Sequence, residues 1–195
     1  MRFKSMSLAI LGLGLILSPV HAATYKVDDA HTTIGFKVRH LFSNVQGNFN
    51  KFEGTVDYEP GKPETWKAKG KIDAASINTN NDKRDEHLRS ADFFDAAGFP
   101  EITFTTTKVT DATDTTAKLE GLLTMHGTEK SVVLGVTIHG AGKDPWGSTR
   151  AGFTAVTKIN RKDFGITYNQ KLDNGGLLLG EEVEITLEIE AVLVP

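Results

Sequence analysis

Hydrophobic and polar residues alternate with a period of two along most of the chain. In the segment 182–193 every odd-numbered residue is apolar, while the even-numbered ones up to residue 190 are Glu or Thr. This period predicts a β-strand with one buried and one solvated face. Similar apolar rows occur in the segments 34–38, 52–58, 66–74, 102–104, 117–125, 132–138 and 151–159.

These roughly eight strands are separated by short turn sequences such as Pro60-Gly61-Lys62-Pro63 and His126-Gly127. Short connections make successive strands antiparallel neighbours. Closing such a sheet on itself buries the apolar face and removes the exposed edges. The sequence therefore predicts an all-β fold, an eight-stranded antiparallel up-and-down barrel. A two-sheet sandwich has the same pattern and is the alternative.

The segment 78–100 interrupts the strand pattern. Asn80 or Asn81 can cap a helix that carries Asp82 in its first turn, and Asp85 and Arg89 stand four residues apart. We expect one short helix at 82–90 followed by a loop. A second long connection, 160–181, is expected to be mostly loop.

Residues 1–22 have the features of a secretory signal peptide. Arg2 and Lys4 precede an apolar run of ten residues, Leu8 to Leu17, and Ala22 closes a plausible cleavage site. We expect cleavage after Ala22, a mature chain of residues 23–195 that forms a single domain, and a periplasmic location in a Gram-negative bacterium. An uncleaved anchor helix is the alternative, although the run is short for a membrane span.

Composition narrows the possible chemistry. The 195 residues contain no cysteine, which excludes disulfides, thiolate zinc sites and cysteine nucleophiles. A net charge of −3 argues against nucleic acid as a partner, because such a partner requires a basic surface. The histidines lack metal-ligand spacing. The expected inventory is therefore no metal, no cofactor and no nucleic acid.

The residues on the apolar rows indicate what the barrel could hold. An eight-stranded barrel is either filled by its side chains or holds one small ligand. Small inward residues (Ala68, Gly70, Ala74, Ala117, Gly121, Ala151, Ala155) suggest an open interior, whereas a filled barrel remains the alternative. The predicted ligand-binding residues are Phe36, Val38, Phe52, Trp66, Ile72, Phe104, Leu119, Leu123, Met125, Phe153 and Ile159. Such an interior favours hydrocarbon, and a barrel about 30 Å tall could enclose a long lipid tail.

A transmembrane barrel would turn the same apolar rows outward. It requires aromatic girdles at both membrane interfaces. The chain has only two Trp and three Tyr. We therefore predict that the protein is not an integral membrane protein.

Polar residues gather in the segment 85–92, which contains an acid, an imidazole, a guanidinium and a hydroxyl. They could grip a polar head group or simply form a solvated helix. The candidate head-group residues are Arg39, His40, His87 and Arg89. Catalysis by His87 or Asp85 is a further hypothesis, although no nucleophile motif accompanies them.

Several motifs together resemble the hallmark of the YceI-like family. They are the run Ser76-Ile77-Asn78-Thr79, the segment 84–94 (RDEHLRSADFF), Phe99-Pro100, Phe104, and the segments 121–128 (GLLTMHGT), 144–147 (DPWG), 150–153 (RAGF) and 161–166 (RKDFGI). The resemblance covers essentially all of residues 23–195.

The resemblance implies a lipocalin-like antiparallel barrel, exported to the periplasm, that holds a polyisoprenoid or a similar long amphiphile; it does not imply an enzyme. The leading hypothesis is a binding or carrier protein for such a lipid. The alternatives are a lipid-modifying enzyme that uses the His87/Asp85 cluster and a stress-protective interaction protein with a filled barrel. The sequence leaves open whether the protein forms a homodimer.

Overall fold

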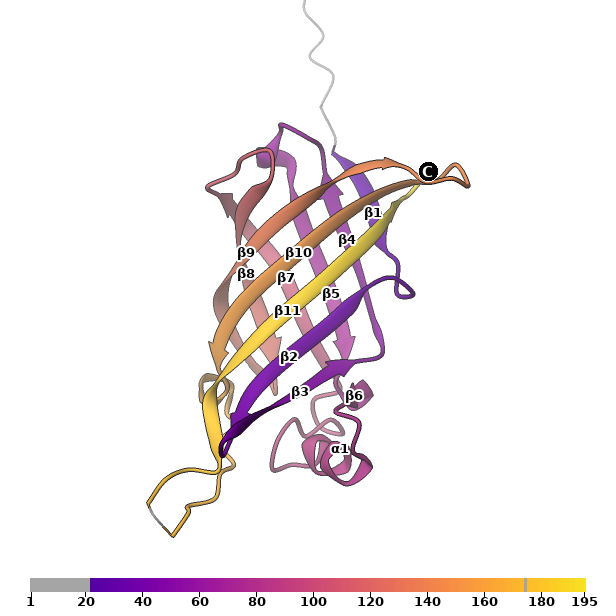
Figure 1. Ribbon diagram of the computed structural model, residues 1–195. Coiled ribbons are helices and arrows are strands. Elements are labelled where there is room, and N and C mark those ends of the chain that lie inside the picture. The colour runs from indigo at the N-terminus through magenta and orange to yellow at the C-terminus, as the bar shows by residue number, and fades with distance from the viewer. Residues whose placement is uncertain (1–21, 174) are drawn as a thin grey trace, which may run out of the picture.

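The computed structural model describes residues 22–173 and 175–195, so the predicted signal peptide lies outside it except for Ala22. One α-helix and eleven β-strands make up the fold in these ranges (Figure 1). The helix is α1 (Asp82–Arg89). The strands are β1 (Ala23–Val27), β2 (Thr33–His40), β3 (Ser43–Phe49), β4 (Phe52–Tyr58), β5 (Lys67–Asp73), β6 (Ile77–Asn78), β7 (Glu101–Thr110), β8 (Thr116–Met125), β9 (Thr128–Lys143), β10 (Thr149–Asn160) and β11 (Leu179–Leu193). Short 3₁₀ turns η1 (Pro63–Thr65), η2 (Ala74–Ser76) and η3 (Arg161–Phe164) lie between strands.

The eleven strands form a closed barrel of eight ribbons in chain order. β1 and β2 both pair with β11 and together form one ribbon along its length. β3 pairs with β2 and β4 pairs with β1, so these two strands form the second ribbon. β5 pairs with β4 and the short β6 with β3, which makes the third. β7 to β11 then follow as single strands, each antiparallel to its neighbours.

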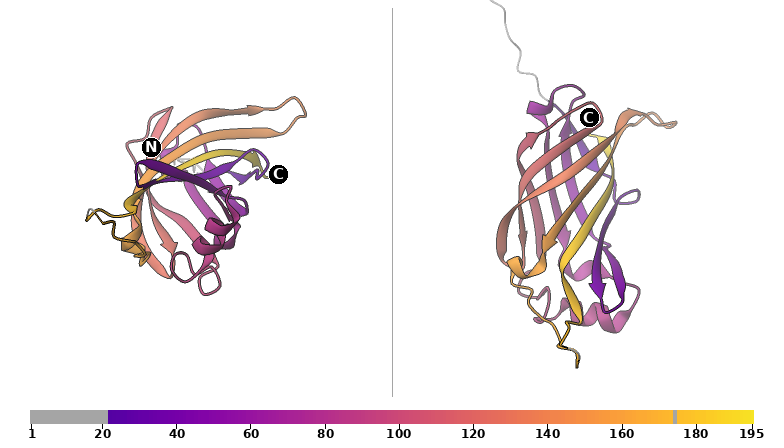
Figure 2. Two further views of the ribbon diagram at one scale, coloured as in Figure 1. Left: turned by 60° about the horizontal axis from the view of Figure 1, so that its bottom comes forward. Right: turned by 60° about the vertical axis from the view of Figure 1, so that its left-hand side comes forward.

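The pairing of β11 with the first ribbon closes the ring, which the tilted view in Figure 2 shows. The predicted eight-stranded antiparallel barrel is therefore confirmed, and the two-sheet sandwich is wrong. The sequence pattern missed β1 and β3. β3 shows a weak apolar pattern, since its inward position 47 is a glycine. A Cβ added at Gly47 would lie 2.6 Å from Phe36 Cζ, so the ring of Phe36 needs this space.

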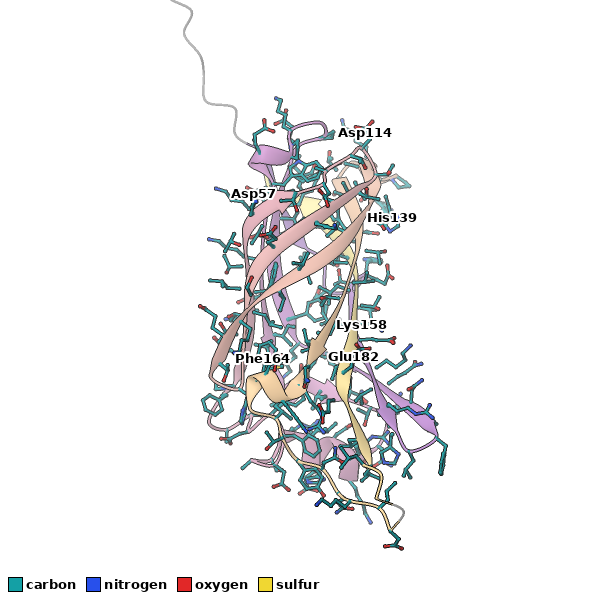
Figure 3. All side chains as sticks on the ribbon, turned by 90° about the vertical axis from the view of Figure 1, so that its left-hand side faces the viewer. Asp57, Asp114, His139, Lys158, Phe164 and Glu182 are labelled. Atoms are coloured by element: carbon teal, nitrogen blue, oxygen red, sulfur yellow. The ribbon has the colours of Figure 1, made fainter. Side chains whose placement is uncertain are left out.

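Apolar rows face the barrel interior and charged residues face outward. Ala151, Phe153 and Ala155 of β10 are buried, whereas the intervening side chains are not. On the outer surface Lys158 Nζ lies 2.8 Å from the Glu182 carboxylate, and both side chains are more than half exposed (Figure 3). The alternative in which the apolar rows turn outward is therefore wrong. In the described residues no helix is long and apolar enough to cross a membrane.

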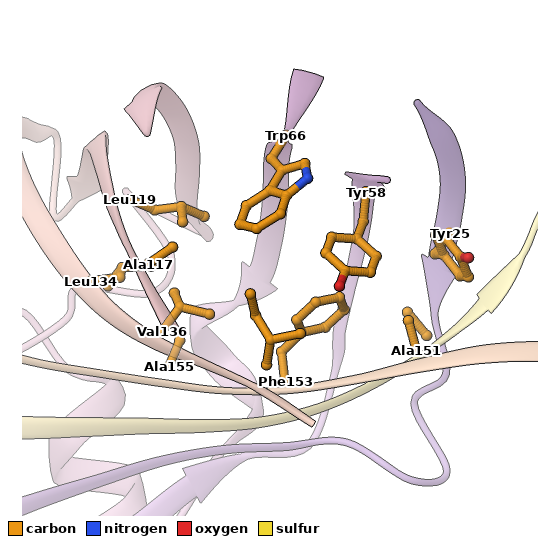
Figure 4. Packing of buried hydrophobic residues seen from close by; sticks show 12 residues of the cluster. Tyr25, Tyr58, Trp66, Ala117, Leu119, Leu134, Val136, Ala151, Phe153 and Ala155 are labelled. Carbon is orange, nitrogen blue, oxygen red and sulfur yellow. The ribbon is translucent and has the colours of Figure 1, made fainter. Parts of the chain in front are cut away.

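Aromatic side chains fill the upper end of the barrel, the end that holds the start of β1 and the C terminus in Figure 1. The Tyr58 ring lies 5.1 Å from that of Trp66 and 5.2 Å from that of Phe153, in a cluster that also contains Tyr25 (Figure 4). Trp66 Nε1 donates a 2.7 Å hydrogen bond to the Glu59 carbonyl oxygen. Burial raises the pKa of Tyr58 above its ordinary value. This end is therefore packed with aromatic rings.

Helix α1 lies at the lower end of the barrel (Figure 1). Its observed range, 82–89, agrees with the prediction, and the Asn81 side chain caps it by accepting a hydrogen bond from the backbone N–H of Arg84. Asp85 and Arg89, which stand four residues apart on the helix, do not bond to each other. The buried Asp85 carboxylate accepts hydrogen bonds from the backbone N–H and hydroxyl of Thr79, while Arg89 donates to the carbonyl oxygens of Ala75 and Ile77. Both side chains therefore fasten the helix to the β5–β6 region.

An ion network anchors the point where the first ribbon passes from β1 to β2. Arg150 donates hydrogen bonds to the carboxylates of Asp28, Asp144 and Glu190, at 2.5–2.8 Å. Asp28 also accepts a hydrogen bond from His31. The bond from Arg150, followed by the bond from His31, lowers the pKa of Asp28 from 3.8 to about 2. Arg150 thus ties β10 to both β11 and the first ribbon.

We expect Arg150→Met to lower the free energy of unfolding at pH 7 and to flatten its dependence on acid pH. A folded-state pKa below the unfolded value contributes stability above about pH 4, and this contribution is lost as the pH falls toward 2. Urea unfolding at pH 7, 4 and 2.5 measures the effect. Lys158→Met, which removes an exposed pair, is the control and should change stability little. Equal acid sensitivity of the wild type and Arg150→Met would contradict the assignment.

Candidate binding cavity

Two cavities lie inside the barrel, one above the other. The upper cavity has a volume of about 140 Å³ and the lower one about 310 Å³. The same side chains line both where they meet: Ile34, Ile72, Ile102, Phe104, Leu123, Leu134 and Leu187. The two cavities therefore adjoin within one elongated apolar interior, and the filled barrel suggested as an alternative does not describe it.

All of the predicted ligand-binding residues line this space. Phe52, Trp66, Leu119 and Phe153 line the upper cavity; Phe36, Val38, Met125 and Ile159 line the lower one; Ile72, Phe104 and Leu123 line both. Period-two alternation is enough to place them, because it fixes which side of each strand faces inward.

The small inward residues have two different roles. Ala68, Gly70 and Ala155 line the upper cavity, as expected if they leave space. Gly121 instead makes room for an aromatic ring: a Cβ there would lie 2.5 Å from Phe104 Cε2 and 2.7 Å from the Thr105 carbonyl oxygen. A Cβ on Gly70 would meet only the Glu53 carbonyl oxygen, at 3.9 Å. The prediction that small residues leave volume therefore holds for Gly70 and is wrong for Gly121.

Aromatic side chains from three segments close around the lower end of the cavity. The His87 ring on α1 lies 5.0 Å from Phe93 and 5.0 Å from Tyr168, and the latter two are 4.9 Å apart. All three line the lower cavity, and the His87 side chain is 42% exposed. This end of the cavity is thus formed by α1 and loops and not by strands of the barrel wall.

The structure brings two of the four predicted head-group residues to the cavity. His40 and His87 line its lower part. Arg39 does not, because it alternates with the inward Val38 on β2 and is exposed. Arg89 does not either, since its guanidinium binds two backbone carbonyls behind the helix. Of the four predicted head-group residues, the structure therefore places Arg39 and Arg89 away from the cavity wall.

Four polar lining residues were missed: Arg84, Thr157, Arg161 and Tyr168. Arg84 donates to the Thr79 hydroxyl and carbonyl oxygen. Arg161 follows β10 directly and is 5% exposed. It donates to the carbonyl oxygens of Gly180 and Ile166, and burial lowers its pKa. Thr157 shares the inward row of Ala155 and Ile159 on β10. Strand periodicity cannot predict Arg84, Arg161 and Tyr168, because they lie on a helix, a 3₁₀ turn and a loop.

The cluster considered for catalysis does not assemble as a pair. Asp85 is buried and bonded to Thr79, whereas His87 Nε2 lies 2.9 Å from the Asp92 carboxylate. Asp85 stabilises the start of α1, and His87 contributes an edge to the aromatic closure.

One group outside the cavity has metal-ligand chemistry. Ligand atoms of Asp28, His31 and Glu190 lie within 4.8 Å of one another. Arg150 already donates a hydrogen bond to each of the two carboxylates. The guanidinium thus supplies the positive charge at this point.

Comparison with known proteins agrees with this architecture. The model of the YceI-like domain matches residues 25–191. The chain belongs to the YceI-like family. A UPF0312 family protein from Shewanella baltica is 40% identical over 194 residues, which cover 97% of this chain and 98% of that one.

Two solved structures show the same barrel. The YCEI protein of Campylobacter jejuni is 35% identical, with a TM-score of 0.70, over 86% of this chain and 96% of that one. A domain from Saccharophagus degradans, described as polyisoprenoid binding, has a TM-score of 0.65 at 14% identity over 89% of this chain and 99% of that one. The second likeness concerns the fold alone.

The YceI-like barrel should distinguish the two kinds of inward glycine. We expect Gly121→Ala to lower the free energy of unfolding by about 1–3 kcal/mol, since the methyl group would displace Phe104 or the β7 backbone. Gly70→Ala should keep or raise stability, because its methyl group enters open space. Urea unfolding of both variants measures the difference, and equal losses would contradict it.

Proposed function

We propose that this protein binds the tail of a polyisoprenoid or similar long-chain lipid inside its barrel and carries it through the periplasm. The observation that carries the proposal is the shape and chemistry of the interior. Two apolar cavities joined end to end suit a long, thin, flexible hydrocarbon better than a compact ligand. Burial of the tail supplies about 25 cal/mol per Å² before the costs of binding are deducted.

The two ends of the barrel give the ligand a direction. The upper end is packed with Tyr25, Tyr58, Trp66 and Phe153, whereas the lower end is bounded by α1 and loops. A lipid would therefore enter from the α1 end, tail first. The name of the Saccharophagus degradans domain supports polyisoprenoid as the ligand class, since that domain shares the fold.

No contact in the described residues favours catalysis as a second function. The carboxylate of Asp85, one of the two residues considered for catalysis, already accepts two hydrogen bonds from Thr79. We therefore propose a binding protein, and lipid recovered chemically unchanged after incubation is the expected result.

Blocking the junction of the two cavities should shorten the tail that can be bound. Leu123 lines both cavities, whereas its neighbour Leu122 faces outward and is 37% exposed. We expect Leu123→Trp to weaken binding of a C40 polyprenol at least about tenfold and binding of a C10 analogue much less. Leu122→Trp should change neither. Tryptophan fluorescence titration and thermal melts of both variants provide the measurements.

Native lipid provides the corresponding test on the unmodified protein. Protein purified from its own compartment should release a long isoprenoid on organic extraction, detected by mass spectrometry. A Leu123→Trp sample prepared in parallel should release less. Wild-type protein that carries no lipid, and takes up none in the titration, would contradict the proposal.

A periplasmic location predicts the N terminus of the mature protein. Intact-mass measurement should show a chain that starts at Ala23, the first residue of β1, where Ala23 pairs with Tyr58. Cell fractionation should recover this species in the periplasmic extract. A chain that retains residues 1–22 in the cytoplasm would contradict the proposed location.

A further inference from the structure

Arg161 is the buried polar side chain of the cavity wall whose hydrogen bonds remain incomplete. It lines the lower cavity and is 5% exposed. Its Nε donates to Gly180 (2.9 Å) and its Nη1 to Ile166 (2.8 Å). Its Nη2 is shielded from solvent and has no partner among the described residues. A buried donor without an acceptor is destabilising, so this atom indicates a missing partner.

Arg161 also has no directly bonded anion among the described residues. Its hydrogen-bond acceptors are backbone carbonyls, which bear no net charge. The carboxylate of Glu181 lies in its neighbourhood but is bonded to Lys162. A buried guanidinium without a directly bonded anion carries a desolvation cost that a ligand oxyanion would offset. A water molecule could accept from Nη2 but would not neutralise the charge.

The other titratable groups of the lower cavity point to the same ligand chemistry. They are Arg84 and His87 on α1, His40 at the end of β2 and Tyr168 in the loop before β11. No Asp or Glu lines this cavity in the described part of the chain, although the protein has more acidic than basic residues. An anion therefore meets cations and neutral groups here and no like charge.

We propose that Arg161 binds the anionic head group, a phosphate or a carboxylate, of the amphiphile held in the barrel. The inference rests on the proposed function, since the tail must occupy the apolar space above. Nη2 donates to a head-group oxygen, and Arg84 and His87 stand at the entrance side. The lipid thus lies with its head toward α1 and its tail toward Trp66.

Three ligands with one tail and different heads test this assignment. Wild-type protein is titrated with a C20 isoprenoid alcohol, the corresponding carboxylic acid and the corresponding monophosphate. We expect at least one anion to bind about 10- to 100-fold tighter than the alcohol, the range for a hydrogen bond to a charged group. Arg161→Met should remove this preference while keeping alcohol affinity within about threefold of wild type.

Arg39→Met is the matched control, because Arg39 is an exposed arginine at the same end of the barrel that faces outward. It should retain the preference for the anion. Arg161→Lys covers the case in which Arg161→Met fails to fold, since Lys keeps the charge but cannot reproduce the planar fork of donors. It should reduce the preference at least about threefold.

The outcomes separate the two proposals. Equal affinity of the wild type for all three ligands overturns the role of Arg161 and leaves the lipid-binding function intact. Binding of none of them overturns the proposed function itself. An unchanged preference in folded Arg161→Met, or in Arg161→Lys, overturns the assignment of the head group to Arg161.

Discussion

The structure depends on closure of the sheet between β11 and the first ribbon. Each strand has one apolar face, and a closed ring turns all of these faces toward one interior while leaving no strand edge unpaired. β11 meets this requirement with two partners, pairing with β1 near its C-terminal end and with β2 along the rest. Since β1 and β2 are joined by the irregular segment 28–32, closure also depends on Arg150, which bonds to Asp28 and Glu190 across the junction.

Closure by itself does not determine whether the interior is filled. The distribution of aromatic rings along the barrel axis determines which parts of the interior are filled. Tyr58, Trp66 and Phe153 pack ring against ring at the upper end, while Phe93 and Tyr168 meet His87 at the lower end. Between the two clusters, where the cavities meet, Phe104 is the only aromatic residue that lines both in the described part of the chain, and the other shared lining residues are Ile and Leu. The elongated space is thus the region left between two aromatic closures.

The fold and the cavity wall could be predicted from the sequence because both follow from a local period. Alternation fixes which residues face inward, so Phe36, Trp66 and Leu123 were placed correctly. The predictions for Gly121 and Arg39 failed for two different reasons. Gly121 is small because Phe104 of a neighbouring strand needs its space, and Arg39 was misplaced because its proximity to His40 in sequence outweighed the alternation. Arg161 begins the motif 161–166 that resembles the YceI-like family. The residues around it in sequence, however, do not indicate that its side chain is buried without a bonded anion.

The polar groups at the lower end divide into those that build the structure and those left available. Asp85, Arg89 and Thr79 satisfy one another or the backbone and fix α1 against β6. The buried Asp85 carboxylate is bound to Thr79, while Arg161 is bonded to backbone carbonyl oxygens. Arg84, His87 and Arg161 thus line the lower end of an apolar space that no Asp or Glu of the described residues lines. That separation of charge from hydrocarbon matches the two parts of an amphiphile.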